Sequence, residues 1–98
     1  MPDAVLVYVD ELREYPLTAI QPSARRHGRV WCHLMADDIE RLHAFAVRLG
    51  MRREWFQSHH NLDWMAHYDL LPSKRALAVR WGAIEIEART WIRQHLTP

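Results

Sequence analysis

The segment from Asp37 to Gly50 constrains the fold more than any other part of this 98-residue chain. Asp37, followed three residues later by Glu40, has the form of a capping box, which predicts that a helix begins there. Gly50 is a typical residue at the end of a helix. Apolar residues recur between these ends at the spacing of one helical face: Ile39, Leu42, Phe45, Ala46 and Leu49. The flanking residues 29–35 and 51–57 are rich in β-formers, so we expect this helix to connect two strands.

Three further segments complete the predicted fold. Residues 5–9 form a short apolar run that predicts a buried strand, and residues 83–86 predict a final strand. Residues 72–82 predict a second helix, and residues 88–96 predict a closing helix with an apolar stripe. We therefore expect one domain over residues 1–98, a small α/β sandwich with about four strands and three helices.

Two stretches have no sustained period and predict long connections. Residues 11–28 contain proline and glycine and have room for one helical turn. Residues 58–66 carry histidine, asparagine and tryptophan and are expected to form a loop beside the functional site, able to cover it. Connections of this length in small domains are often functional or mobile.

Composition narrows the class of protein. Hydrophobic residues make up 49% of the chain and charged residues 26%, which is the ordinary globular mixture and argues against disorder. No apolar run approaches the ~20 residues of a membrane span, so no membrane partner is expected. The single cysteine excludes an internal disulfide and indicates a reducing compartment, which predicts a cytoplasmic protein.

Arginine dominates the basic residues, because Lys74 is the only lysine among the 13 lysines and arginines. Arginine suits bidentate contacts to carboxylate or phosphate groups. A genome-wide bias toward arginine would explain the same count without any function. Both interpretations remain open at the level of sequence.

Residues 67–75 concentrate polar chemistry where an extended segment leads into a helix. Ser73 follows Pro72 and predicts a helix N-cap. The amide groups of that first turn, together with Lys74 and Arg75, would form a positive site for phosphate, sulfate or carboxylate. The alternative is that Lys74 and Arg75 pair with acidic residues of the fold or point into water.

Four residues near the expected strand ends have the chemistry of a metal site. Asp10, His33, His67 and Asp69 offer two imidazoles and two carboxylates, which suits zinc, manganese or iron. With a phosphate held nearby, such a site predicts metal-assisted hydrolysis of a phosphoester. A metal-free version uses His67 as general acid or base, oriented by Asp69 or Asp10, with His33 in the same catalytic cluster. The alternative is that His67 and Asp69 form a pair that only fixes the loop.

Cys32 is not expected to belong to this cluster. It precedes His33 on an expected strand, so the two side chains point to opposite faces. We expect Cys32 to lie in the core.

Several blocks of residues form a pattern that resembles a known family. They are Val7–Asp10 (VYVD), Trp31–Asp37 (WCHLMAD), His67–Leu70 (HYDL), Ser73–Arg75 (SKR) and Gly82–Ala83. The pattern resembles an uncharacterised family of short bacterial and phage proteins known as domain of unknown function 4031. The resemblance covers nearly the whole chain in the same order, and the chain differs in its longer connection at residues 11–28. It implies that these blocks belong together, and it implies no catalytic assignment.

Three hypotheses of function follow. The first is a protein that binds a phosphorylated ligand, either a nucleotide or a nucleic acid, and acts as a metal-dependent phosphoester hydrolase. The second is a non-catalytic module of phage or accessory-gene origin that binds nucleic acid or a protein partner. The third is a structural cluster in a homodimer whose interface holds exposed aromatic residues.

Overall fold

The computed structural model describes residues 5–96 and contains a mixed sheet built around one central strand, β3 (Val30–Ala36). Strand β1 (Val7–Val9) pairs with β3 in the antiparallel direction, and β4 (Tyr68–Leu70) pairs antiparallel along the other edge of β3. Strand β5 (Ile84–Glu85) lies parallel to β1, and β2 (Arg13–Glu14) pairs with the beginning of β3. The α/β class predicted from the sequence is confirmed.

A local irregularity separates β1 from β2. Val9 lies opposite Leu34, whereas Arg13 lies opposite Trp31, so the pairing register changes by one residue between the two short strands. An extra residue of this kind is the mark of a β-bulge, which bends the strand and redirects a side chain. Asp10 lies at this point in the chain.

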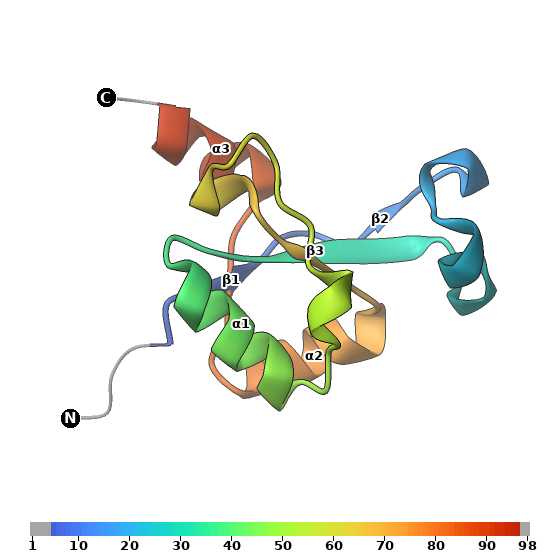
Figure 1. Ribbon diagram of the computed structural model, residues 1–98, viewed down its shortest axis with the longest axis horizontal. Coiled ribbons are helices and arrows are strands. Elements are labelled where there is room, and N and C mark those ends of the chain that lie inside the picture. The colour runs from blue at the N-terminus through green and yellow to red at the C-terminus, as the bar shows by residue number, and fades with distance from the viewer. Residues whose placement is uncertain (1–4, 97–98) are drawn as a thin grey trace.

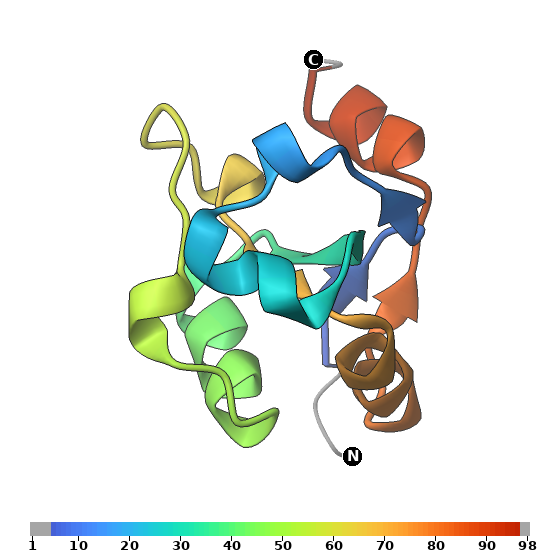
Figure 2. The same cartoon turned by 90° about the vertical axis from the view of Figure 1, so that its right-hand side faces the viewer.

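The helices cover both faces of the sheet. Helices α1 (Ile39–Arg48) and α2 (Pro72–Arg80) lie on one side of β3, and α3 (Ala88–Leu96) lies on the other, together with the short 3-10 helix η4 (Asp63–Met65) (Figure 1). The perpendicular view shows the same separation of α3 from α1 and α2 (Figure 2). Within residues 5–96, no helix has both the length and the apolar content needed to cross a bilayer.

The alternation of side chains along β3 decides which residues enter the core. Cys32, Leu34 and Ala36 are buried on the side of α1, and the residues between them point to the opposite face. The core is completed by Val7, Val9, Leu42, Phe45, Ala46, Leu49, Tyr68 and Leu70. Cys32 is 1% exposed, as expected for a core residue.

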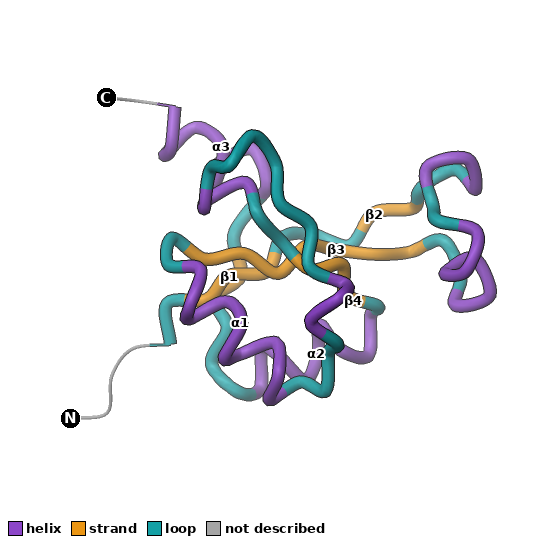
Figure 3. Tube along the Cα trace, in the orientation of Figure 1, coloured by secondary structure: helices purple, strands orange, loops and turns teal. Residues whose placement is uncertain are grey.

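The prediction of a strand at residues 51–57 is wrong. This stretch contains the 3-10 helix η3 (Arg53–Trp55), and Gln57 makes only an isolated bridge to His67. The physical reason is competition for the central strand, because β1 and β2 occupy one edge of β3 and β4 occupies the other. Much of the chain between α1 and β4 is therefore loop (Figure 3).

Two predicted helix starts are also corrected. The N-cap of α1 is Asp38, whose carboxylate accepts the N–H of Glu40 at 2.9 Å, and not Asp37. The N-cap of α2 is Leu71, with Pro72 at the first helical position, so the prediction of Ser73 as N-cap is wrong. Proline suits that position because its missing N–H needs no partner there.

The long connections contain more structure than the sequence predicts. Residues 11–28 include β2 and the 3-10 helices η1 (Leu17–Ala19) and η2 (Pro22–His27). These elements form an arm that projects from the body of the molecule at the far end of β3 (Figure 1).

Candidate metal centre

Neighbouring strands place three of the predicted site residues on one face of the sheet. His33 of β3 lies directly opposite Asp69 of β4, so their side chains emerge side by side. His67 precedes Asp69 by two residues and therefore shares its face. This face is the one opposite α1 and α2, so the cluster lies outside the main core.

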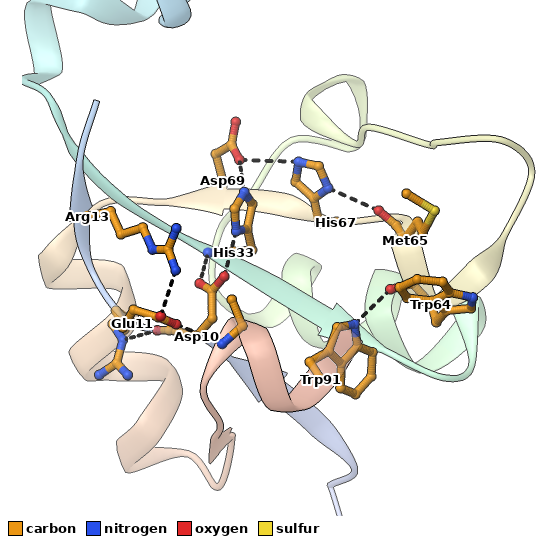
Figure 4. Close-up of polar contacts among 11 residues, drawn as sticks. Asp10, Glu11, Arg13, His33, Trp64, Met65, His67, Asp69 and Trp91 are labelled. Atoms are coloured by element: carbon orange, nitrogen blue, oxygen red, sulfur yellow. Dashed lines mark hydrogen bonds and ion pairs between the residues drawn. The ribbon is translucent and has the colours of Figure 1, made fainter. Parts of the chain in front are cut away.

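The polar atoms of this cluster converge. The distance from His33 Nε2 to Asp69 Oδ1 is 3.9 Å, and that from His67 Nε2 to the same oxygen is 3.4 Å. The two imidazole rings meet edge to face with centroids 4.6 Å apart. One ligand atom from each residue can be chosen so that all three lie within 4.8 Å of one another (Figure 4). Metal–ligand bonds of ~2.0–2.2 Å require ligand atoms at separations of this order, so small side-chain movements would close the site.

Each of the three side chains has a partner that fixes its orientation. His33 Nδ1 donates to Asp10 Oδ2 at 2.6 Å, and His67 Nδ1 donates to the carbonyl of Met65 at 3.2 Å. Gln57 Nε2 donates to Asp69 Oδ2 at 2.6 Å. Because carboxylate and carbonyl oxygens only accept, both histidines carry a proton on Nδ1 and can present Nε2 as a ligand. Outer partners of this kind accompany most metal-binding histidines.

Asp10 lies behind His33 and is not one of the three convergent residues. Its side chain is buried, and its Oδ1 accepts the backbone N–H of His33 at 2.6 Å while Oδ2 accepts the ring N–H. Both oxygens of the carboxylate are thus committed to one residue. Asp10 therefore orients His33, and its role as a fourth metal ligand stays a prediction.

The environment shifts the pKa values of two cluster members in opposite directions. Burial favours neutral His33, but its hydrogen bond to Asp10 and the charges of Asp10 and Asp69 outweigh burial and raise the pKa of His33. Burial also disfavours the carboxylate of Asp69, but the hydrogen bond and charge of His67, together with Gln57 and His33, lower the pKa of Asp69. Asp69 is therefore ionised at neutral pH, as a metal ligand must be.

His33 and His67 also line a hollow of about 300 Å³, whereas Asp69 is not one of its lining residues. One wall is α3, whose Trp91 donates its indole N–H to the carbonyl of Trp64 at 2.9 Å (Figure 4). On the other side, the ring of His59 stacks on His67 with centroids 5.1 Å apart. The loop of residues 58–66 thus borders the cluster. Trp64 and Met65 of this loop line the hollow, as do residues that the sequence did not place at the site: Arg13, Tyr15, Met35, Ala88, Trp91 and Ile92.

The predicted anion-binding residues do not share this hollow. Lys74 Nζ donates to the carbonyl of Leu49 at the end of α1. Arg75 donates to the carbonyl of Asp10 at 2.8 Å and to the carboxylate of Glu85 at 2.9 Å. Ser73 is an exposed residue of the first turn of α2. The contacts of Lys74 and Arg75 match the alternative interpretation, in which the fold itself uses both cations, and anion binding by these three residues stays a prediction.

The thiol of Cys32 is a poor nucleophile at neutral pH. Burial, and next the negative charge of Asp10, raise the pKa of its thiol to about 12. The nucleophilic thiolate is therefore scarce at neutral pH.

Comparison with known proteins assigns the chain to a family. A family model described as "Protein of unknown function (DUF4031)" matches residues 19–97. The chain belongs to the DUF4031 family. The part that matches the DUF4031 model includes His33, Gln57, His67, Asp69 and all of α3, whereas Asp10 lies before it. No curated protein and no solved structure matches the chain, so the chemistry of this DUF4031 protein has to be inferred from its geometry.

Glu11 contacts the first residue of α3, the helix that forms one wall of the hollow. Glu11 accepts the N–H of Ala88 at 2.8 Å and the guanidinium of Arg13 at 2.9 Å, and these contacts lower the pKa of Glu11 from 4.5 to about 2. A lowered carboxylate pKa stabilises the folded state fully above about pH 4.5, and that stability is lost as the pH falls toward 2. We expect Glu11→Gln to cost about 0.5–1 kcal/mol at pH 7, the low end for a helix cap because the side chain is 40% exposed.

Urea unfolding at pH 7 and at pH 3 measures this difference, which should shrink at the lower pH. Glu14→Gln is the control, because the side chain of Glu14 is 66% exposed and forms a surface ion pair with Arg29 at 3.3 Å. An equal cost for Glu11→Gln at both pH values would contradict the assignment of its charge to α3.

Proposed function

We propose that this protein is a metal-dependent phosphoester hydrolase in which His33, His67 and Asp69 hold one divalent ion. One observation carries the proposal: Nε2 of both histidines and Oδ1 of the aspartate converge, while the other polar atom of each side chain already has a partner. A site whose ligands are already oriented by hydrogen bonds can bind a metal without rearranging those hydrogen-bond partners.

The set of ligands indicates the kind of ion. Two imidazoles and one carboxylate suit zinc, and they also suit iron or manganese. Three protein ligands leave coordination positions for water and substrate, which is typical of catalytic and not of structural zinc sites. The hollow that His33 and His67 line has room for both.

The bound ion would supply a Lewis acid and a water molecule of lowered pKa. The protein would supply the rest. Asp10 and Gln57 keep His33 and Asp69 in position, and Trp64 and Trp91 restrict water on one side of the hollow. Arg13 lines the same hollow, and although its guanidinium pairs with Glu11 at 2.9 Å, it keeps further N–H donors for a phosphoryl group. That arginine, with the arginines next to it on α3, supports a phosphoester over an uncharged ester as substrate.

The test uses protein without a histidine tag, treated with chelator and titrated by calorimetry with Zn²⁺, Mn²⁺ or Fe²⁺. We expect about one equivalent of one of these ions to bind and to restore hydrolysis of bis(p-nitrophenyl) phosphate. Asp69→Asn should lose both properties, whereas His60→Ala should keep both, because His60 is an exposed loop residue outside the cluster.

The outcomes separate the parts of the proposal. If none of the three ions binds, the proposal fails. His67 and Asp69 are then a pair that only fixes the loop. If an ion binds and no phosphate monoester or diester is hydrolysed, the metal centre stands and the hydrolase does not.

A further inference from the structure

A second concave surface adjoins the metal centre along the outer side of α3. This groove has a volume of about 530 Å³ and is lined by Arg13, Ala88, Arg89, Ile92, Arg93 and Leu96. Arg13, Ala88 and Ile92 also line the hollow in front of His33 and His67. The groove and the hollow are therefore neighbours with three lining residues in common.

The charge of the groove is of one sign. Among residues 5–96, three arginines and no acidic residue belong to its lining. Glu11, the carboxylate beside it, already accepts from Arg13 and from the N–H of Ala88. A ligand that lies in the groove therefore meets guanidinium groups, which recognise phosphate by paired hydrogen bonds.

The groove is also apolar between its arginines. Ile92 is 46% exposed and Leu96 is 68% exposed, although both are large aliphatic side chains. Arg89 and Arg93 are separated by one helical turn on the same side of α3, a spacing similar to that of neighbouring phosphates on a nucleic-acid strand. Alternating charged and apolar contacts fit a chain that carries a phosphate and a flat ring in every unit.

The wall that carries these residues is firmly held. Trp91 donates a hydrogen bond to the carbonyl of Trp64, and the ring of His95 lies between two acceptors, with Nε2 at 2.5 Å from Asp37 Oδ1 and Nδ1 at 2.8 Å from the carbonyl of Trp91. The ring of Trp64 stacks on His95 with centroids 5.0 Å apart. The groove thus has a fixed position relative to the cluster of His33, His67 and Asp69.

Size argues for a polymer. A single phosphoester would be accommodated by the hollow of about 300 Å³ and would leave the larger groove unused. Tyr15 and Trp64 are partly exposed aromatic residues in the hollow, and aromatic faces are reached by unpaired bases.

We propose that the groove along α3 binds a single-stranded nucleic acid and leads its backbone to the metal centre, so that the bond hydrolysed is an internucleotide phosphodiester. This inference rests on the proposed function for its chemical step. In that step, water adds to phosphorus and the P–O bond to one nucleoside breaks. The products are a phosphomonoester end and a hydroxyl end, and no oxidant or further reactant is needed.

The experiment measures binding of a fluorescent 12-nucleotide single strand to the full chain in the presence of chelator, over a series of salt concentrations. The variant Arg89→Ala with Arg93→Ala is compared with the control Arg52→Ala with Arg80→Ala, which removes the same charge from two exposed arginines outside the groove and the hollow. We expect the groove variant to bind at least about tenfold more weakly. The slope of log affinity against log salt should fall by roughly 1.4, that is, ~0.7 for each lost phosphate contact.

Cleavage is then followed with metal added, using the same strand and bis(p-nitrophenyl) phosphate in parallel. Hydrolysis of the small diester by the wild type, with the strand neither bound nor cut, would overturn the inference and leave the proposed function standing. Binding of the strand through the groove with neither substrate cut would show that the proposed function fails while the groove binds nucleic acid as a non-catalytic module. Equal losses in the two double variants would overturn the groove as the binding site. Equal affinity for poly-glutamate or for duplex DNA would overturn single-stranded nucleic acid as its ligand.

Discussion

Alanine in place of His67 is expected to lower the affinity for the divalent ion by at least about 100-fold and to remove measurable hydrolysis of bis(p-nitrophenyl) phosphate. Loss of an outer partner of a metal ligand already costs about 10- to 100-fold, and loss of the ligand itself costs more. His67 Nε2 lies 3.4 Å from Asp69 Oδ1 and His33 Nε2 lies 3.9 Å from it, so the substitution removes the nearer of the two histidine nitrogens. Calorimetric titration and initial rates measure the two effects.

A graded comparison makes this prediction specific. Gln57→Ala removes only the side chain that donates to Asp69 Oδ2, so we expect an intermediate loss of affinity of about 10- to 100-fold. His59→Ala removes a ring that stacks on His67 without belonging to the cluster, so it serves as the control for general disturbance of the loop. A variant His67→Ala that binds metal as tightly as the wild type would rule out His67 as a ligand.

The second large effect is expected in the core. Leu34 is fully buried at the centre of β3, with β1 and β4 on either side, so Leu34→Ala should lower the free energy of unfolding by about 2–5 kcal/mol. A domain of this size has a total stability of about 5–15 kcal/mol. The melting temperature should therefore fall by roughly 4–8 °C for each kcal/mol lost.

The control for Leu34→Ala is Val47→Ala. Val47 lies on the outer side of α1 and is 65% exposed, so its truncation should change stability by no more than about 0.5 kcal/mol. Calorimetric melting curves measure both variants. If Leu34→Ala were as mild as Val47→Ala, the placement of β3 at the centre of the core would be wrong.

The parts of the fold that follow from local periodicity were predictable from the sequence. The apolar face of α1 follows from apolar residues spaced three and four positions apart. Strand alternation alone predicts that the side chains of Cys32 and His33 point to opposite faces of the sheet. Residues 51–57 show the limit of that reasoning. Their composition favours a strand, but composition does not reveal that both edges of β3 are occupied by other segments.

The site divides in the same way. His33, His67 and Asp69 could be grouped because polar residues at strand ends share a face when the strands pair. The partners of Lys74 and Arg75 lie 25 and 65 residues away in the chain, so no local pattern could distinguish structural cations from an anion site. The position of α3 beside the site could not be predicted for a related reason. The contact of Trp91 with Trp64 depends on how two distant segments pack.

Strand β3 contributes alternate residues to two separate purposes. Leu34 and Cys32 serve the side of the sheet that holds the molecule together, and His33 serves the side where ligands can arrive. Over evolutionary time, substitutions at neighbouring positions of one strand could therefore change robustness or chemistry independently of each other. Asp10 is the exception, because its carboxylate orients His33 while its backbone carbonyl anchors Arg75 of α2, so a change in this part of the chain affects both at once.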